Sequence, residues 1–460
     1  MSSMLNFPHH RQRASGGDLQ RIIQPSTNGS TYKFGQSIDL VIAGNQSGYM
    51  DIHSSYVRLK IAYDRKATTA PHALTLSPDG VFSFFSKIEL LSSGTTISSI
   101  DEYSKLASIA LSGDCNVTTR SGPAAVQYGM GNGLGYDLGK SDAADGTGTV
   151  GTEEVTLSFP LLMTALWSSS KYLPLCGNDL RIRLTLRSAE TALILGTKAV
   201  ITSGALVLPD DATSNNWAGD VNDVTISPVE LVMYKVVLTP EADAIVKSQA
   251  GDVYNLILND YSCNVSNVTD TATSANFQLG ASYSSLSRVF FGFYPNYSSD
   301  VLRQKGSTES HRITRNLVKY NFNVAGQKIP AQELTADLQG STCLQENMNV
   351  MKLVGDFQHL NSINATNWSI SSLITKGGRS AAGTTTIGTR YFDIDLETQR
   401  NYDSVNGIYA GINTLSQPTS LQCTFSAAGT ASDVVIFAEH QIGFKLDMSP
   451  MGTRTWRVQV

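Results

Sequence analysis

Hydrophobic and polar residues alternate with a period of two along much of the chain. In DLRIRLTLRS, Leu180, Ile182, Leu184 and Leu186 alternate with Arg181, Arg183, Thr185 and Arg187. Successive side chains of a strand point to opposite faces of its sheet, so this pattern predicts a strand with one buried face. The same alternation occurs in SYVRLKIAY, VFSFFSKIELL, VELVMYKVVL, LVKYNFNV and HQIGFKLD, and runs rich in Gly, Ser, Asn and Asp separate these segments.

Helical patterns are few and short. Three segments carry helix start signals: Ser99 with Glu102 and Thr342 with Gln345 as capping boxes, and Thr239 as an N-cap followed by Pro240. Gly251 marks the end of the third helix. A chain made mostly of strands with a few helices favours a sandwich or a barrel.

One order of elements recurs in the two halves of the chain. In the first half a strand leads into a turn at Gly94, a short extended piece and a capped helix, and the same order surrounds Gly326. The separation of these two glycines is close to half the length of the chain. Each half holds roughly eight strand candidates, which predicts an all-β fold of two eight-stranded antiparallel sandwiches with long loops.

The duplication also sets the domain boundaries that we expect. A flexible N-terminal arm covers residues 1–28, and the first β domain covers 29–239. A helical connection at 240–252 then leads into the second β domain at 253–460.

The composition describes a globular protein with a weakly charged surface. Hydrophobic residues make up 41% of the chain and charged residues 16%, which excludes a disordered or fibrous protein. The net charge of −5 argues against nucleic-acid binding through the overall field. A local basic segment remains at the N-terminus, where Arg11, Arg13 and Arg21 are candidates for contact with nucleic acid; an ordinary disordered terminus is the alternative.

The cysteines indicate a protein made in a reducing compartment. The chain has five cysteines, widely spaced along the sequence, so it holds no Cys-x-x-Cys pair for a metal or for redox chemistry. An odd number favours free thiols. The N-terminus lacks the apolar stretch of a signal peptide, and no run approaches the roughly 18 apolar residues of a membrane span. We therefore expect synthesis in the cytosol and no membrane span.

A glycine-rich segment resembles a phosphate-binding loop at its end only. GMGNGLGYDLGKS, residues 129–141, ends in Gly-Lys-Ser, but Leu134 stands where the first glycine of that loop is required. The following run, SDAADGTGTVGTEE, lacks the helical periodicity that should face the phosphate. We interpret this segment as a long surface loop and expect no cofactor.

Acidic and histidine clusters offer candidate chemistry, and each has a simpler structural interpretation. Asp393, Asp395 and Glu397 share one face of a strand. This face is either a site for a hard cation or for acid–base chemistry, or a strand face exposed to solvent, and we favour the second interpretation. His311, beside Arg312 and Arg315, is expected in a polar surface cluster or subunit contact, and His440 is expected to make a structural hydrogen bond. No nucleophile elbow accompanies these histidines, so we expect neither a catalytic site nor a metal site.

The arginine face of DLRIRLTLRS is the best candidate for recognition. Arg181, Arg183 and Arg187 project together and are candidates for a subunit contact or for phosphate binding; an exposed strand face is the alternative.

The order of several motifs resembles the double jelly-roll major capsid proteins of polinton-like viruses, adintoviruses and virophages. The first half contributes SFPLL, SSSKYLPL, NDLRIRLTLRSAETA and, after a further stretch of chain, ISPVELVMYKVVLTPE. The second half contributes SLSRVFFGF, YNFNVAGQKIP and AEHQIGFKLD. The resemblance covers most of residues 30–450 and depends on the order of motifs.

The resemblance implies that the two β domains are jelly rolls in tandem. Proteins of this family form homotrimers with a pseudo-hexagonal outline, which tile an icosahedral shell around double-stranded DNA. It implies localisation in the virion, contacts with minor or penton capsid proteins, and non-specific contact with DNA. Two other interpretations stay open: a carbohydrate-binding or carbohydrate-active β-sandwich using Asp393, Asp395, Glu397 and Trp368, and a capsid protein with one shell domain and one protruding domain.

Overall fold

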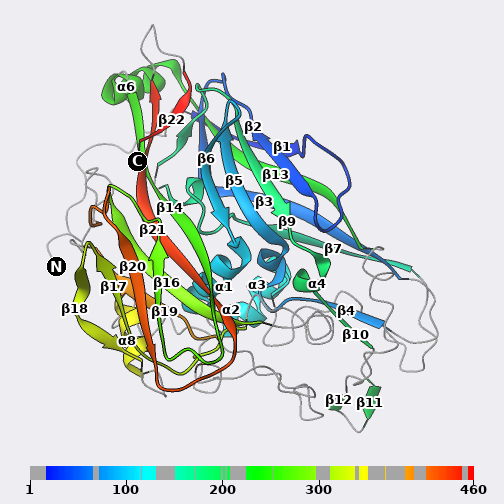
Figure 1. The fold of residues 1–460 in the computed structure, drawn as a ribbon. Coiled ribbons are helices and arrows are strands. Elements are labelled where there is room, and N and C mark those ends of the chain that lie inside the picture. The colour runs from blue at the N-terminus through cyan, green and yellow to red at the C-terminus, as the bar shows by residue number, and fades with distance from the viewer. Residues whose placement is uncertain are drawn as a thin grey trace, which may run out of the picture.

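Two β-sandwiches lie side by side in the chain (Figure 1). The computed structural model describes residues 17–65, 72–115, 117–130, 151–169, 171–197, 200–202, 205–207, 224–251, 253–296, 311–336, 341–350, 368, 389–397, 411–447 and 454–459. In these residues no helix is long and apolar enough to cross a membrane.

The first sandwich consists of two antiparallel sheets and two short strand pairs. Its first sheet contains β1 (Gly17–Pro25), β13 (Val224–Leu238), β3 (Tyr49–Arg65) and β7 (Gly151–Phe159) in that order, with β8 (Leu173–Pro174) paired to β3. Its second sheet contains β2 (Ser37–Ile42), β9 (Leu180–Leu186), β5 (Phe85–Ser92) and β6 (Thr95–Asp101). The additional pairs are β4 (His72–Leu76) with β10 (Leu193–Thr197), and β11 (Val200–Thr202) with β12 (Ala205–Val207).

The second sandwich repeats this arrangement. Its first sheet contains β14 (Val253–Val268), β21 (Ser432–Asp447), β16 (Leu286–Pro295) and β19 (Phe392–Asp395), with β22 (Trp456–Gln459) paired to β21. Its second sheet contains β15 (Ser274–Leu279), β20 (Thr419–Phe425), β17 (Leu317–Val324) and β18 (Gln327–Thr335).

Strand order identifies both sandwiches as jelly rolls. When the eight principal strands of each are numbered along the chain, one sheet has the order 1-8-3-6 and the other 2-7-4-5. This double Greek-key order defines a jelly roll. We call residues 17–238 roll 1 and residues 253–459 roll 2. The principal strands correspond one to one: β1 to β14, β2 to β15, β3 to β16, β5 to β17, β6 to β18, β7 to β19, β9 to β20 and β13 to β21.

Local details repeat as well. The hairpin β5–β6 turns at Ser93 and Gly94, with φ of 48° and 83°, and the hairpin β17–β18 turns at Ala325 and Gly326, with φ of 50° and 89°. Positive φ at both central residues defines the tight turn that matches the twist of a hairpin, and glycine adopts it readily. A helix follows each hairpin. The duplication predicted around the two glycines is thus present in the structure.

A cross-strand ion pair occupies the same place in both rolls. On the third and eighth strands, Arg58 pairs with Glu230 in roll 1 and Arg288 pairs with Glu439 in roll 2. The closest nitrogen–oxygen distances are 2.5 Å and 2.6 Å. This shared pair fixes the alignment of the two rolls residue by residue along their first sheets.

The first strand of roll 1 begins earlier than the sequence predicts. Gly17–Pro25, expected within a flexible arm at residues 1–28, form β1 and pair with β13 over their whole length. Without β1 the first sheet of roll 1 would lack the counterpart of β14. The prediction missed this strand because β1 is an exposed edge strand with little apolar alternation; residues 1–16 lie outside the described part of the chain.

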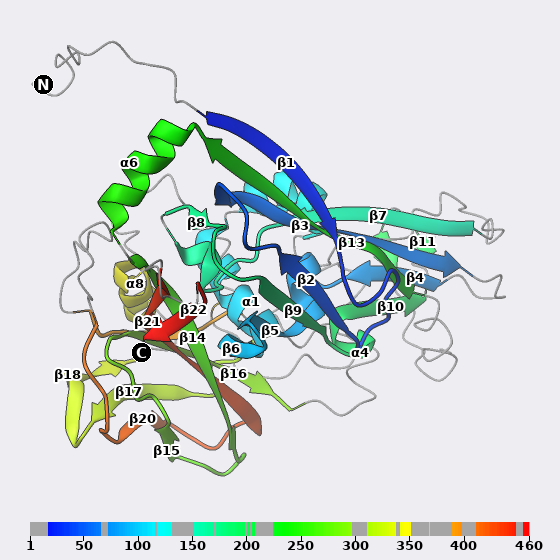
Figure 2. The same cartoon turned by 90° about the horizontal axis from the view of Figure 1, so that it is seen from above.

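The helices are short and connect the strands. They are the 3₁₀ helices η2 (Gly80–Phe84) and η3 (Leu166–Ser168) and the α-helices α1 (Tyr103–Asp114), α2 (Val117–Ser121), α3 (Pro123–Tyr128), α4 (Ala189–Ala192), α6 (Pro240–Ala250) and α8 (Ser341–Val350). Helix α6 starts and ends as predicted, since Thr239 accepts a hydrogen bond from the Ala242 N–H and Gly251 adopts a positive φ. From above, α6 connects the two rolls at one end (Figure 2).

Both predicted capping boxes are wrong. Ser99 lies in β6, paired to Glu89 of β5, and Glu102 precedes α1 with a left-handed φ of 55° and no capping hydrogen bond. The hairpin continues through residue 101, so its backbone pairing replaces the expected cap. Helix α8 already begins at Ser341, which places Thr342 inside the helix.

The interior of each roll is built around aromatic side chains. In roll 1, Phe82, Phe85 and Phe159 pack edge to face or tilted, with ring centroids 5.8 Å and 5.7 Å apart. In roll 2, Phe291 stacks on Phe392 at 5.1 Å and meets Tyr320 at 5.5 Å. Such pairs add to the stabilisation from burying large apolar surfaces. The buried side chains of the two rolls form one continuous cluster.

Candidate assembly surfaces and the junction between the rolls

The junction between the rolls centres on β6 of roll 1 and β14 of roll 2. The buried Ser98 hydroxyl on β6 donates a hydrogen bond of 2.6 Å to the Asp260 carboxylate on β14. Beside it, the Ser168 hydroxyl of η3 accepts a hydrogen bond of 2.8 Å from the Asn259 N–H and contacts the Asn259 carbonyl at 3.3 Å. Polar groups of both rolls therefore satisfy one another where water is excluded.

Burial sets the protonation of the junction. It raises the pKa of Asp260, although His440 and the Ser98 hydrogen bond act in the opposite direction. It also lowers the pKa of His440, whose Nε2 lies 3.9 Å from an Asp260 carboxylate oxygen. The imidazole stacks on Tyr283 at 3.7 Å, and its Nδ1 lies 3.3 Å from the Ala438 carbonyl oxygen. His440 thus has the structural role that the sequence predicts.

A buried arginine joins the rolls at a second place. Arg312 of roll 2 donates hydrogen bonds of 2.9 Å and 2.8 Å to the hydroxyls of Ser108 and Ser112, which lie one turn apart on α1 of roll 1. It also donates to the Thr389 carbonyl at 2.8 Å. Because a buried guanidinium needs many acceptors, this arrangement holds α1 firmly against roll 2.

A third set of contacts lies near α6 and the C-terminal strand. The Tyr49 hydroxyl of β3 donates a hydrogen bond of 2.8 Å to Asp243 of α6 and lies 3.3 Å from the Tyr254 hydroxyl of β14. Asn178 donates its backbone N–H to the Arg454 carbonyl at 2.9 Å and accepts from the Trp456 N–H at 3.0 Å. The three sets together join the two rolls through contacts at several places along their junction.

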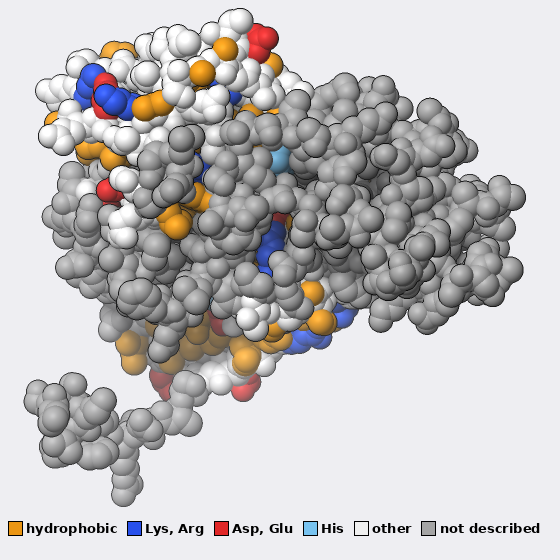
Figure 3. Space-filling model, turned by 90° about the horizontal axis from the view of Figure 1, so that it is seen from below, with side chains coloured by type: hydrophobic (Ala, Val, Ile, Leu, Met, Phe, Trp, Pro, Cys, Tyr) orange, Lys and Arg blue, Asp and Glu red, His pale blue; other side chains and the backbone are white. Residues whose placement is uncertain are grey.

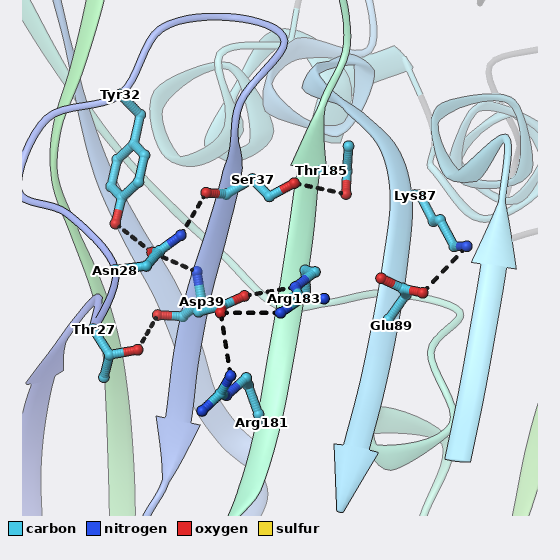
Figure 4. Close-up of polar contacts among 10 residues, drawn as sticks. All are labelled: Thr27, Asn28, Tyr32, Ser37, Asp39, Lys87, Glu89, Arg181, Arg183 and Thr185. Atoms are coloured by element: carbon cyan, nitrogen blue, oxygen red, sulfur yellow. Dashed lines mark hydrogen bonds and ion pairs between the residues drawn. The ribbon is translucent and has the colours of Figure 1, made fainter. Parts of the chain in front are cut away.

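The three arginines predicted on one strand face make different contacts in the structure. Asp39 on β2 lies between Arg181 and Arg183 on β9, with closest distances of 3.5 Å and 2.9 Å (Figure 4). Hydrogen bonding to Asp39 raises the pKa of Arg183. Arg181 stays half exposed. Arg187, beyond the end of β9, instead turns to Glu102 at 2.5 Å and Ser104 at 2.7 Å and is largely buried.

The N-terminal arginines are placed only in part. Arg21 is exposed on β1 and donates to the Tyr56 hydroxyl at 3.3 Å. Arg11 and Arg13 lie outside the described residues. Seen from below, basic and acidic side chains are interspersed over the described part of the surface (Figure 3).

The acidic strand is not a solvated face. Phe392, Ile394 and Leu396 are buried as predicted, but Asp393 on the opposite side is also buried, with one carboxylate oxygen 3.9 Å from Arg288. Burial raises the pKa of Asp393 to about 7, against the opposing charge of Arg288. The alternation did not predict this burial because the covering residues come from distant strands. Asp395 accepts a hydrogen bond from the Glu397 N–H, a local turn contact.

The histidine and tryptophan candidates are buried too. His311, Arg312 and Arg315, predicted in a surface cluster, are each fully buried. Arg315 donates to backbone carbonyls, with the Thr269 oxygen at 2.6 Å. Trp368 is also buried and packs against Tyr391, so it offers no exposed platform for a sugar ring. Of the residues that motivated a carbohydrate site, Asp393 and Trp368 thus belong to the interior of roll 2, whereas Asp395 and Glu397 are half-buried.

The remaining predictions concern thiols, metals and the glycine-rich loop. All five cysteines are present as reduced thiols. Among the described residues, no three His, Cys, Asp or Glu side chains gather as a metal site. Of the loop at 129–141, the structure describes Gly129, which ends α3 with a φ of 67°, and the buried Met130; the rest lies outside the described residues.

Comparisons with known proteins agree on the fold. No protein-family model and no curated protein sequence matches the chain. A chain in the structure of the Sputnik virophage has a TM-score of 0.56 at 11% identity, covering 99% of this chain and 91% of that chain. The Faustovirus major capsid protein has a TM-score of 0.54 at 10% sequence identity, and the match covers 95% of this chain and 92% of that chain. The mavirus major capsid protein has a TM-score of 0.51 at 11% sequence identity, and the match covers 100% of this chain and 93% of that chain. The chain therefore has the double jelly-roll fold of viral major capsid proteins.

Proposed function

We propose that this chain is a major capsid protein. Three copies associate into a capsomer with a pseudo-hexagonal outline, and the capsomers tile an icosahedral shell around a double-stranded DNA genome. The role is structural, and the proposal assigns no enzymatic activity. The protein is made in the cytosol of the host cell and resides in the virion.

The observation that carries the proposal is the strand-for-strand repetition of one jelly roll within a single chain. Two equivalent rolls give each copy two similar building units, so three copies supply six units around a threefold axis. This arrangement also argues against one shell domain joined to one protruding domain. The fold likeness extends over more than nine-tenths of the mavirus and Faustovirus proteins, whose names state that they are major capsid proteins.

The proposal extends to boundaries and partners. The functional units are the two rolls, joined by the helical connection at 240–252; roll 1 incorporates β1 as well as residues 29–239. Arg11, Arg13 and Arg21 are proposed to contact the genome, because they precede or lie on the first strand of the shell unit. The exposed Arg181 and its neighbour Arg183 are proposed to contact a second subunit. Minor or penton capsid proteins complete the shell.

Light scattering coupled to size-exclusion chromatography tests the proposal. One chain has a mass of 49.5 kDa, so we expect a species of three times that mass, or larger shell-like particles. A strictly monomeric protein at every concentration and salt would contradict the proposal. A glycan-binding screen serves as the control for the carbohydrate hypothesis and is expected to give no binding.

A further inference from the structure

The junction inside the chain has a counterpart on the outer sides of the described part of the chain. Within one copy, β6 of roll 1 packs beside β14 of roll 2. The strand correspondence makes β18 of roll 2 equivalent to β6, and β1 of roll 1 equivalent to β14. Both β18 and β1 are terminal strands of their sheets. Figure 2 shows β6 and β14 between the rolls, whereas β1 and β18 lie on different outer sides of the molecule.

Both outer strands carry exposed side chains. Every residue of β1 is exposed or half-buried, and Leu19 and Ile23 are 65% and 41% exposed. No residue of β18 is buried. A terminal strand with free backbone groups and exposed apolar side chains is an association surface that proteins otherwise protect. The described part of the chain leaves Leu19 and Ile23 uncovered.

The alignment of the rolls fixes which residues correspond. Gln24 pairs with Leu231, the residue after Glu230, and Asp260 pairs with His440, the residue after Glu439. Gln24 is therefore the counterpart of Asp260, because Glu230 and Glu439 occupy the same place in the two rolls.

The hairpin turns give the matching position on the other strand. Leu90 and Phe322 each lie four residues before the turn glycine of their hairpin, and Leu90 pairs with Ser98 whereas Phe322 pairs with Ile329. Ile329 is therefore the counterpart of Ser98, the residue that contacts Asp260 inside the chain.

The direction of the two strands can be followed in Figure 1. Strand β14 runs away from α6, which precedes it, and β6 runs from the same end of the molecule toward α1, which follows it. Strands β6 and β14 therefore run parallel across the junction.

We infer that β18 of one copy packs beside β1 of the next copy, parallel to it, and that this contact repeats the β6–β14 junction between subunits. The inference rests on the proposed trimer and specifies its interface. The correspondence places Ile23 of one copy near Ile329 and Pro330 of its neighbour, so apolar side chains meet where the polar Ser98 and Asp260 meet inside the chain. The contact joins two different surfaces, and three copies related by a threefold rotation close it into a ring.

Crosslinking between introduced cysteines tests the contact directly. The double variant Gln24→Cys with Ala331→Cys places one thiol on β1 and one on the exposed part of β18. Treatment of the intact protein with a short bismaleimide should produce covalent dimers and trimers on a denaturing gel. Each single variant measures the background from Cys176 and Cys263, which are half-buried in the natural chain. A matched control joins Ala331→Cys with Val126→Cys, since Val126 is 75% exposed on α3 and belongs to no counterpart of the junction.

The outcomes separate this inference from the proposed function. Trimers by mass together with crosslinks specific to the Gln24/Ala331 pair support both. Trimers without these crosslinks overturn the β18–β1 contact and leave the capsid role standing, whereas monomers overturn both.

A second variant tests the same contact without chemical crosslinking. Ile23→Lys should weaken trimer association roughly tenfold or more, because it places a charge in an apolar contact. Val126→Lys should leave association unchanged. Equal trimer stability in the two variants would contradict the inference.

Discussion

The repeated arginine–glutamate pair gives a prediction with an internal control. Arg288 and Glu439 have side chains that are 16% and 10% exposed, and Arg288 also faces the buried Asp393. In roll 1, Arg58 and Glu230 occupy the same place but are 35% and 18% exposed. The chemistry and the cross-strand geometry match, and the difference lies in burial. The pair in roll 2 should therefore be far more sensitive to the loss of its cation.

The expected magnitudes follow from that difference. Arg288→Met leaves Glu439 and Asp393 without their cation in the interior, and removing one partner of a buried pair costs about 3–5 kcal/mol of unfolding free energy. Arg58→Met leaves Glu230 near solvent, where such a pair contributes at most about 1 kcal/mol. Methionine keeps most of the apolar volume of each side chain, so the comparison isolates the charge.

Equilibrium unfolding in urea measures both variants against the natural protein. Tryptophan fluorescence and circular dichroism should both be followed, because a chain with two rolls need not unfold in a single step. Arg288→Met should lower the unfolding free energy much more than Arg58→Met. Equal losses, or a larger loss for Arg58→Met, would refute the argument that burial determines the contribution of this pair.

Three further predictions concern single contacts. The pKa of Asp393 is raised to about 7, so the folded protein favours the neutral carboxyl group. The stability of the protein should therefore fall as pH rises from about 4 to about 7. Thermal melts at several pH values measure this dependence, and Asp393→Asn should flatten it. Ser98→Ala removes the hydrogen bond to the buried Asp260 and should lower the unfolding free energy by about 1–3 kcal/mol in urea titrations; an unchanged midpoint would argue against a tight junction. Gly94→Ala and Gly326→Ala should each cost about 1–2 kcal/mol, because both positions have positive φ in open space; a large difference between them would count against equivalent hairpins.

Sequence periodicity predicted most of the strands because each roll buries one face of each sheet. The side chains of the alternating residues are buried as expected at Leu180, Ile182, Leu184 and Leu186. Thr239 and Gly251 located α6 because both act through local backbone geometry. These signals depend only on neighbours in the chain.

The sequence could not predict what covers each strand. Asp393 and Arg312 stand at polar positions of the sequence pattern, which predicts exposure to solvent. In the structure, strands and helices from distant parts of the chain bury both side chains. Gly80–Phe84 form a 3₁₀ turn with Phe82 and Phe84 buried, although their alternation with Ser83 predicts a strand. The junction contact between Ser98 and Asp260 likewise has no local signal, because it joins positions far apart in the sequence.

Electron microscopy of the purified protein can establish how the rolls are arranged in the assembly. Class averages should show particles with threefold symmetry and six similar lobes, in which junctions within chains alternate with β18–β1 contacts between chains. Monomers, or particles with only twofold symmetry, would contradict this arrangement.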